Sequence, residues 1–254
     1  MVRPKKGYAV ATTRHEEIAD RLTEDILRGR YRTGERLPSE RDLSSRFNAS
    51  RGAAREAIKV LEQLGLADVK PGGARVRAIE DSSLDVLGPL LSLGEYPDPD
   101  LIQQMMEVMD ALISVAVKRA IQNASNTEID EARAIIARVV DPDLPIEDVV
   151  QARMNLAQHI LRISGNLVLA LIGRALRVQI LSSKENRDDD FLADVDTSGQ
   201  RQCMRWLDKS LKERDEAGAV SALNRLAELN KQLVLPALEE ARRGMDPQTK
   251  ATMP

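Results

Sequence analysis

Helix-start signals, arginines and glycines follow one another in a fixed order between residues 33 and 79, and this order constrains the fold more than any other feature. Ser39 can cap a short helix, and Asp42, three residues later, can complete a capping box. After a loop at residues 48–49, Ser50 can start a second helix. The apolar face of that second helix consists of Ala54, Ala57, Ile58, Leu61 and Leu64. Two short helices in close succession are therefore predicted.

The second helix carries two arginines, and a glycine-containing hairpin follows it. Arg51 and Arg55 are four residues apart, so they project from one helical face. Residues 66–69 and 75–77 alternate sufficiently to form a two-stranded ribbon with its turn at Gly72-Gly73. Two short helices, the second of them basic, and such a ribbon are the parts of a winged helix-turn-helix. The sequence thus predicts a DNA-binding module.

The chemistry of DNA recognition requires residues of these kinds. A recognition helix enters the major groove by its N-terminal end, where side chains meet base edges. Arginine can bind guanine O6 and N7 together, which is worth about 1–3 kcal/mol of discrimination. Gly52 between the arginines leaves room for the backbone to approach DNA, and Gly72-Gly73 can adopt positive φ at the tip of the ribbon. An arginine pair alone is more often a solvated helix face, but the ordered set favours DNA binding.

Residues 33–79 resemble the DNA-binding domain of the GntR family of bacterial transcription regulators. The similar stretches are residues 34–43, 50–57 and 61–66. The resemblance implies DNA contacts by Arg41, Arg51 and Arg55, a position at the groove for Ser50 and Gly52, and a minor-groove wing at Gly72 and Gly73.

Charge is distributed unevenly along the 254 residues, which are enough for two domains. Of 37 basic and 40 acidic side chains, residues 1–80 carry 17 basic and 12 acidic ones, leaving 20 basic and 28 acidic ones to the remainder. A basic N-terminal part on an acidic remainder suits a protein that binds phosphate with one end. Residues 1–13 are interpreted either as a basic arm that touches DNA or as a disordered leader.

Two further features bear on the cellular compartment. Cys203 is the only cysteine, which excludes an intrachain disulfide and a thiolate metal cage, and it is interpreted as an inert side chain. The chain has no run of 18 apolar residues and no hydrophobic stretch typical of a signal peptide. We therefore expect a cytoplasmic protein that does not enter a membrane.

From residue 82 onward the pattern is helical. Apolar residues recur at helical spacing over residues 101–122, 127–139, 146–164, 167–183, 199–214 and 216–242. Thr127 with Asp130 is expected to cap one helix, Pro145 to begin the next and Gly165 to end it. Pro236 predicts a kink or break. The expected fold is mainly α, with an N-terminal winged helix-turn-helix and a C-terminal antiparallel helical bundle.

The domain boundaries expected from these patterns are a basic arm over residues 1–13, the winged helix-turn-helix over 14–80, a linker over 81–99, a helical effector-binding and dimerisation domain over 100–243 and a disordered tail over 244–254.

Residues 100–243 resemble the effector-binding domain of the FadR subgroup of the same family. The similarity lies in His159-x5-Gly165-Asn166 and, more weakly, in residues 207–219. In many relatives an Asp and three His hold a divalent metal that orients a carboxylate effector. The resemblance places Asn155 at the Asp position and His159 at one His position, with Met204 and Leu226 at the two others.

The remaining donor set is unsuited to a metal, because one imidazole and one neutral amide cannot replace three imidazoles and a carboxylate. We therefore expect no metal and no cofactor. Asn155 and His159 are interpreted either as a hydrogen-bonded core pair or as the lining of a metal-free effector cavity together with Met109, Met204 and Leu226. The acidic residues 188–190 are interpreted as a solvated loop rather than a metal site.

The effector is expected to be an acyl-coenzyme A or an organic acid. Residues 83–87 and 101–104 look similar to the branch of the subgroup that binds acyl-coenzyme A, and methionine packs adaptably around apolar ligands. Methionine at helical spacing is also ordinary core. Met109 stands where relatives frequently have Arg, and Arg153, Arg174 or Arg177 could supply that charge instead.

The sequence predicts a homodimeric transcription regulator, with repression preferred over activation, that binds a palindromic operator under the control of a small-molecule effector. Two alternatives remain open: an architectural DNA-binding protein whose bundle only dimerises, and a metal-dependent, carboxylate-sensing regulator. No catalytic constellation is recognisable, so an enzyme is not expected.

Overall fold

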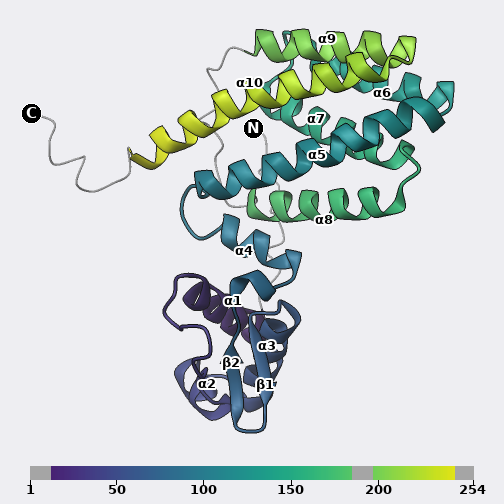
Figure 1. Cartoon of the computed structure of the whole chain (residues 1–254). Coiled ribbons are helices and arrows are strands. Elements are labelled where there is room, and N and C mark those ends of the chain that lie inside the picture. The colour runs from purple at the N-terminus through teal and green to yellow at the C-terminus, as the bar shows by residue number, and fades with distance from the viewer. Residues whose placement is uncertain (1–12, 185–196, 244–254) are drawn as a thin grey trace, which may run out of the picture. The chain divides into compact units, whose positions relative to one another are not determined.

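The computed structural model describes residues 13–184 and 197–243, which form two compact units (Figure 1). The N-terminal unit ends at Leu93 and the C-terminal unit begins at Gly94. The expectations for the basic arm before Thr13, for residues 188–190 and for the tail over residues 244–254 fall outside the described residues.

The N-terminal unit contains the helices and the ribbon that the sequence predicts. Its principal elements are α1 (Arg14–Leu27), α2 (Glu40–Arg46), α3 (Arg51–Gln63), β1 (Ala67–Lys70) and β2 (Gly73–Val76). The two strands pair antiparallel, with Ala67 opposite Val76 and Lys70 opposite Gly73. Two 3₁₀ turns, Ile79–Asp81 and Leu84–Val86, and the short helix α4 (Leu87–Leu91) follow. The winged helix-turn-helix is confirmed.

Both predicted N-caps are formed. The amide of Asp42 donates to Ser39 Oγ at 3.2 Å, and the amide of Ser39 donates to Asp42 Oδ2 at 3.3 Å, which completes the capping box of α2. Ser50 Oγ accepts a hydrogen bond from the amide of Ala53 at 3.1 Å at the start of α3. These bonds satisfy amides that an isolated helix end leaves unpaired, and they fix where each helix begins.

The segment expected to begin the linker is folded onto the N-terminal unit. Val86 is buried in the same apolar cluster as the helices of that unit, and the amide of Ser83 donates to the carbonyl of Leu64 at 2.9 Å. Gly65 makes the close approach possible, because a Cβ there would lie 2.9 Å from Ser82 Cα and its φ is +76°. Residues 81–93 are therefore held against the DNA-binding fold rather than extended away from it.

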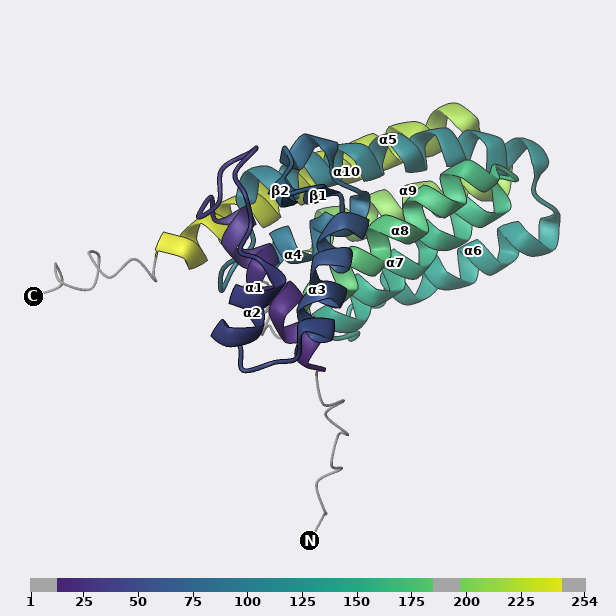
Figure 2. The same cartoon turned by 90° about the horizontal axis from the view of Figure 1, so that it is seen from below.

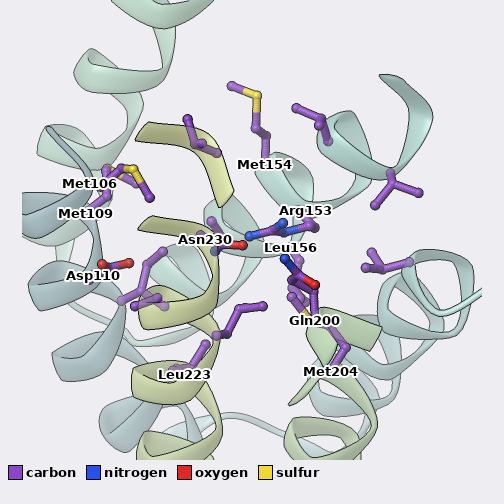
Figure 3. Close-up of a pocket in the computed structure, with 18 of the residues that line it drawn as sticks. Met106, Met109, Asp110, Arg153, Met154, Leu156, Gln200, Met204, Leu223 and Asn230 are labelled. Atoms are coloured by element: carbon purple, nitrogen blue, oxygen red, sulfur yellow. The ribbon is translucent and has the colours of Figure 1, made fainter. Parts of the chain in front are cut away.

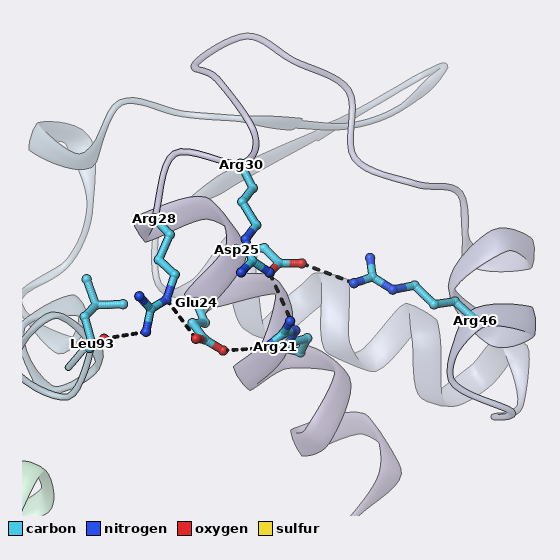
Figure 4. A network of polar contacts seen from close by, with 7 residues as sticks. All are labelled: Arg21, Glu24, Asp25, Arg28, Arg30, Arg46 and Leu93. Atoms are coloured by element: carbon cyan, nitrogen blue, oxygen red, sulfur yellow. Dashed lines mark hydrogen bonds and ion pairs between the residues drawn. The ribbon is translucent and has the colours of Figure 1, made fainter. Parts of the chain in front are cut away.

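A buried carboxylate organises one side of this unit (Figure 4). Asp25 near the end of α1 is only 2% exposed. Its two oxygens receive Arg30 at 2.6 Å, Arg46 of α2 at 3.3 Å and Arg21 at 3.6 Å. One side chain thus ties α1 to the loop after it and to the last turn of α2.

The C-terminal unit is a bundle of long helices within residues 94–184 and 197–243 (Figures 1 and 2). They are α5 (Pro99–Asn123), α6 (Asn126–Val139), α7 (Ile146–Ile163), α8 (Leu167–Lys184), α9 (Ser198–Glu213) and α10 (Glu216–Arg243). Each lies where the apolar spacing predicts it, to within a few residues. Figure 2 shows α6, α7 and α8 side by side, while α10 packs on α5 and α9. The mainly α fold class is confirmed.

One cap expected in this unit is wrong, and the break that was one of two possibilities at Pro236 does not occur there. The cap of α6 is Ser125, whose Oγ accepts from the amide of Glu128 at 3.3 Å, and not the predicted pair of Thr127 and Asp130. Pro236 does not end α10, which continues to Arg243. No helix among the described residues is sufficiently long and apolar to span a membrane.

Replacement of Asp25 by Ala is expected to lower the free energy of unfolding of the N-terminal unit by about 1–3 kcal/mol, because charge-assisted hydrogen bonds of α1 and α2 are lost together. Calorimetry of the full chain measures the change in the unfolding transition of the N-terminal unit. Asp68→Ala, at an exposed ion pair with Lys70, is the control and should change stability by under about 0.5 kcal/mol. Equal effects of the two substitutions would contradict a structural role for Asp25.

Candidate functional site

The DNA contacts predicted on the helices of the N-terminal unit lie at the exposed N-terminal ends of α2 and α3. Arg51 is the first residue of α3 and Gly52 the second, directly after the cap Ser50. Arg41 lies in the first turn of α2, and all four residues are exposed. A helix N-terminus with free amides and a flanking arginine is suited to contact with phosphate and base edges.

Arg55, the second arginine of α3, is held by a partner that sequence reasoning missed. Its Nε and Nη2 donate to the two carboxylate oxygens of Glu40 at 3.0 and 3.1 Å. This hydrogen-bonded pairing lowers the pKa of Glu40. Arg51 forms no ion pair with any residue in the described ranges, so its guanidinium is available. Because the pairing joins residues that are 15 positions apart and lie on different helices, no spacing rule within one helix identifies it.

The wing is a tight hairpin that is supported by contacts with the segment before α2. Gly72 and Gly73 have φ of +110° and +117°, a conformation that glycine adopts without strain. Arg75 of β2 donates to the carbonyl of Gly34 at 2.9 Å, and residue 36 forms an isolated bridge with residue 75. The segment before α2 therefore supports the ribbon whose tip carries the two predicted wing glycines.

The C-terminal unit encloses a cavity of about 390 Å³ (Figure 3). Side chains of α5, α7, α9 and α10 form most of its wall, and that wall is predominantly apolar. Methionines contribute prominently, namely Met105, Met106, Met109, Met154 and Met204. A cavity of this size and character is typical of a small-molecule site.

The structure brings together only some of the residues expected to bind the effector. Met109, Met204 and Leu226 line the cavity. Asn155 and His159 do not belong to its lining, and the expectation that they stand beside Met204 and Leu226 is not met. The reason is rotational: they follow Arg153 and Ala157 by two residues, roughly 200° around a helix.

The hydrogen bonds of Asn155 and His159 do not join the two side chains, and each side chain has one partner on another helix. His159 Nε2 donates to the carbonyl of Glu128 on α6 at 2.9 Å, and Arg162 donates to His159 Nδ1 at 3.1 Å. Asn155 Oδ1 accepts from Arg177 of α8 at 2.6 Å. Both side chains thus connect α7 to its neighbours, and the interpretation of the two as a mutual core pair does not describe these contacts.

Four polar side chains of the cavity wall have no partner among the residues that the structure describes. Arg153 of α7 forms neither a hydrogen bond nor an ion pair there, and Asp110 Oδ2 of α5 is buried without a hydrogen bond. The amides of Gln200 and Asn230 also face the cavity without a side-chain partner in the described part of the chain. Because buried polar atoms are nearly always paired in native proteins, the unpaired Asp110 Oδ2, with three other polar side chains on the same wall, makes this cavity the candidate ligand site.

Burial acts on both charges. It lowers the pKa of Arg153 and raises the pKa of Asp110. Lys231 and Arg153 oppose the shift of the Asp110 pKa, while Glu107 adds to it. Perturbed groups in a cavity are typical of functional sites.

Arg153 was named from the sequence only as one of three possible charges, although a stronger signal was present. Val149, Arg153, Leu156 and Ile160 fall at the spacing of a buried helical stripe, so the arginine interrupts a core face. An unpaired charge within such a stripe indicates either a buried ion pair or a ligand.

The side chains around the cavity do not fit the metal set of the FadR-type relatives. Met204 and Leu226 offer no ligand of the required kind, and the guanidinium of Arg153 disfavours a cation. Within residues 13–184 and 197–243, no three His, Cys, Asp or Glu side chains are grouped to hold a metal.

Replacement of Asp110 by Asn is expected to remove a pH-dependent loss of stability. Since the native pKa of Asp110 is raised, the native chain holds a proton that the unfolded chain has released, and stability falls as pH rises through this interval. An amide side chain cannot ionise, so the melting temperature of the variant relative to the parent should increase as the pH rises above the ordinary carboxyl pKa of about 4. Calorimetry with Glu213→Gln, an exposed change on α9, is the control; a pH-independent difference would contradict the assignment.

Two family models match the chain in separate regions. Residues 14–76 match the bacterial regulatory proteins of the gntR family, and residues 104–229 match the FCD domain. The first match covers α1, α2, α3 and the ribbon of the N-terminal unit, and the second covers α6 to α9 with most of α5 and about half of α10.

Relatives and solved structures agree with these matches. The transcriptional repressor NanR of Citrobacter rodentium is 25% identical over 213 residues, 82% of this chain and 80% of that protein. NanR of Escherichia coli O127:H6 is 26% identical over 182 residues, 70% and 68% of the two chains. The structure of Lar, which controls expression of the Listeria monocytogenes agr system, is similar in fold with a TM-score of 0.56 at 16% identity, covering 87% of this chain and 96% of that one. The chain belongs to the GntR family of bacterial transcription regulators, with an effector-binding FCD domain.

Proposed function

We propose that this regulator is a repressor whose affinity for a palindromic operator is controlled by a small organic acid bound in the cavity of the C-terminal unit. The observation that carries the proposal is the set of unpartnered polar side chains in an otherwise apolar cavity. Repression is the function named for the NanR relatives. As a DNA-binding protein of bacteria, the chain would act in the cytoplasm and would perform no catalysis.

The proposed DNA contacts are the exposed residues at the starts of α2 and α3 and the tip of the wing. Arg51 is the proposed base-reading side chain, with Arg41, Ser50 and Gly52 beside it. Arg55 would contact DNA in one of two ways. Its guanidinium would keep its hydrogen bonds to Glu40, which then orients it, or it would break these bonds and bind a phosphate or a base instead. Gly72-Gly73 would let the wing approach the minor groove.

A second copy of the chain is the proposed partner, because a palindromic operator presents two equivalent half-sites. An exposed apolar stripe on α8 supports this proposal. Leu167 is 71% exposed and Leu171 57% exposed, with Val168 and Val178 on the same helix, and the exposed Val115 lies on α5, which packs on α8. Exposed apolar patches of this kind are typical of protein interfaces.

Control of DNA binding needs only a modest energetic preference. An effector that binds one state of the dimer about 1.4 kcal/mol more tightly than the other changes operator affinity tenfold. In the dimer, a change in the distance or angle between the two recognition helices would prevent both from fitting the half-sites, whose spacing is fixed.

The cavity favours a sensing role over the alternative of an architectural DNA-binding protein. A bundle that only dimerises has no need to keep Arg153 and Asp110 unpaired, because such groups cost stability. A compact organic acid suits the cavity volume of about 390 Å³, whereas an acyl-coenzyme A would place only its acyl chain there.

Replacement of Arg51 by Ala is expected to weaken operator binding by about 1–3 kcal/mol and to relax base preference at one position of each half-site. Fluorescence anisotropy with the operator and with single-base variants measures both effects. Arg138→Met, an exposed change on α6, is the control. Unchanged affinity and unchanged base preference would exclude Arg51 from base recognition.

Treatment with EDTA is expected to leave the melting temperature of the C-terminal unit unchanged, and added Zn²⁺ or Mn²⁺ is expected not to raise it. The reason is that Met204 and Leu226 cannot replace the histidine ligands of the FadR-type relatives. A thermal-shift titration of the full chain measures this. A dose-dependent stabilisation by either metal would instead favour the metal-dependent carboxylate sensor.

A further inference from the structure

Two side chains of opposite charge line the cavity, and each stabilises the charged form of the other without a direct contact. Asp110 enters from α5 and Arg153 from α7 (Figure 3), and no ion pair joins them in the described part of the chain. Lys231, which also influences Asp110, already pairs with Glu107 at 3.7 Å. Each charge is therefore positioned to receive a partner from a ligand.

The chemistry of the ligand follows from this pair of charges. A monoanion would compensate Arg153 but leave the buried Asp110 oxygen unpaired, and an amine would leave Arg153 unpaired. Leaving either group unsatisfied in a low-dielectric cavity costs a large part of the binding energy. A molecule that carries a carboxylate and an ammonium group satisfies both with charge-assisted hydrogen bonds, whereas a neutral donor would pair Asp110 more weakly.

We propose that the effector is an α-amino acid with an apolar side chain, an inference that rests on the cavity's being the regulatory site of the proposed function. The α-carboxylate binds the guanidinium of Arg153, whose planar fork can donate two hydrogen bonds. The α-ammonium group binds Asp110.

The remaining wall of the cavity selects the apolar side chain. Met105, Met106, Met109 and Ile113 of α5 present flexible or branched apolar groups, and methionine adjusts to ligands of different shape. Gln200, which is only 7% exposed, and Asn230 also line the cavity and add amide groups to its wall. This arrangement binds a carboxylate with an arginine where the FadR-type relatives use a metal.

The test compares three molecules with the same hydrocarbon tail in calorimetric titrations of the full chain in EDTA. L-norleucine carries both charged groups, hexanoate lacks the ammonium group and pentylamine lacks the carboxylate. We expect norleucine to bind at least about tenfold more tightly than either analogue, a difference of about 1.4 kcal/mol. L-leucine, L-methionine and L-phenylalanine establish which apolar side chain is preferred.

Variants separate charge recognition from loss of the fold. Arg153→Met should abolish norleucine binding, whereas Asp110→Asn should weaken norleucine about tenfold or more and leave hexanoate unchanged. Arg138→Met and Glu213→Gln, which change exposed residues away from the cavity, should bind norleucine as the parent does. Thermal unfolding of every variant verifies that the C-terminal unit still unfolds cooperatively.

Several results would overturn the inference: hexanoate or pentylamine binding as tightly as norleucine, an Asp110→Asn variant with unchanged norleucine affinity, or no binding by any of the four amino acids at millimolar concentration. Operator-binding assays distinguish its failure from that of the proposed function. If norleucine binds without changing operator affinity, the amino-acid site stands and the regulatory role fails. If an acid that lacks an ammonium group controls operator binding, the regulatory role stands and the amino-acid site fails.

Discussion

The buried carboxylate of Asp25 is the constraint on which the DNA-binding surface depends. The N-terminal unit presents many arginines, and their mutual repulsion would oppose a compact arrangement of α1 and α2. Asp25 gathers Arg21, Arg30 and Arg46 around one charge that the fold hides from solvent. Glu40 acts similarly on Arg55 at the surface, so that Arg51 remains the arginine of α3 without an ion pair in the described part of the chain.

The C-terminal unit shows a different arrangement, in which Arg153 and Asp110 line a cavity without a direct ion pair in the described part of the chain. Arg153 and Asp110 reduce the stability that an all-apolar stripe would give, and natural proteins keep such costs chiefly at functional sites. The apolar packing of the surrounding helices, around residues such as Ile160, Leu207 and Leu211, offsets the cost. Stability and function are thereby divided between different residues of the same helices.

Local signals in the sequence predicted much of the fold, but their reliability depended on how local the governing interaction is. The caps at Ser39 and Ser50 were predicted correctly because a capping bond spans three residues. The cap of α6 was placed two residues late, since Ser125 with Glu128 and Thr127 with Asp130 are both acceptable pairs. The segment after residue 81 was expected to be a linker because its contacts with Leu64 and Gly65 are not visible in its own composition.

The sequence by itself determined the winged helix-turn-helix, the positions of the six long helices and the identity of the arginines proposed to face DNA. Each of these follows from periodicity and from short-range hydrogen bonds along one segment. Only the tertiary structure decided which face of α7 meets the cavity, and it placed Arg153 there and Asn155 and His159 elsewhere. The physical reason is that an error of two residues rotates a helical position almost to the opposite face, and only packing against α5, α9 and α10 fixes that rotation.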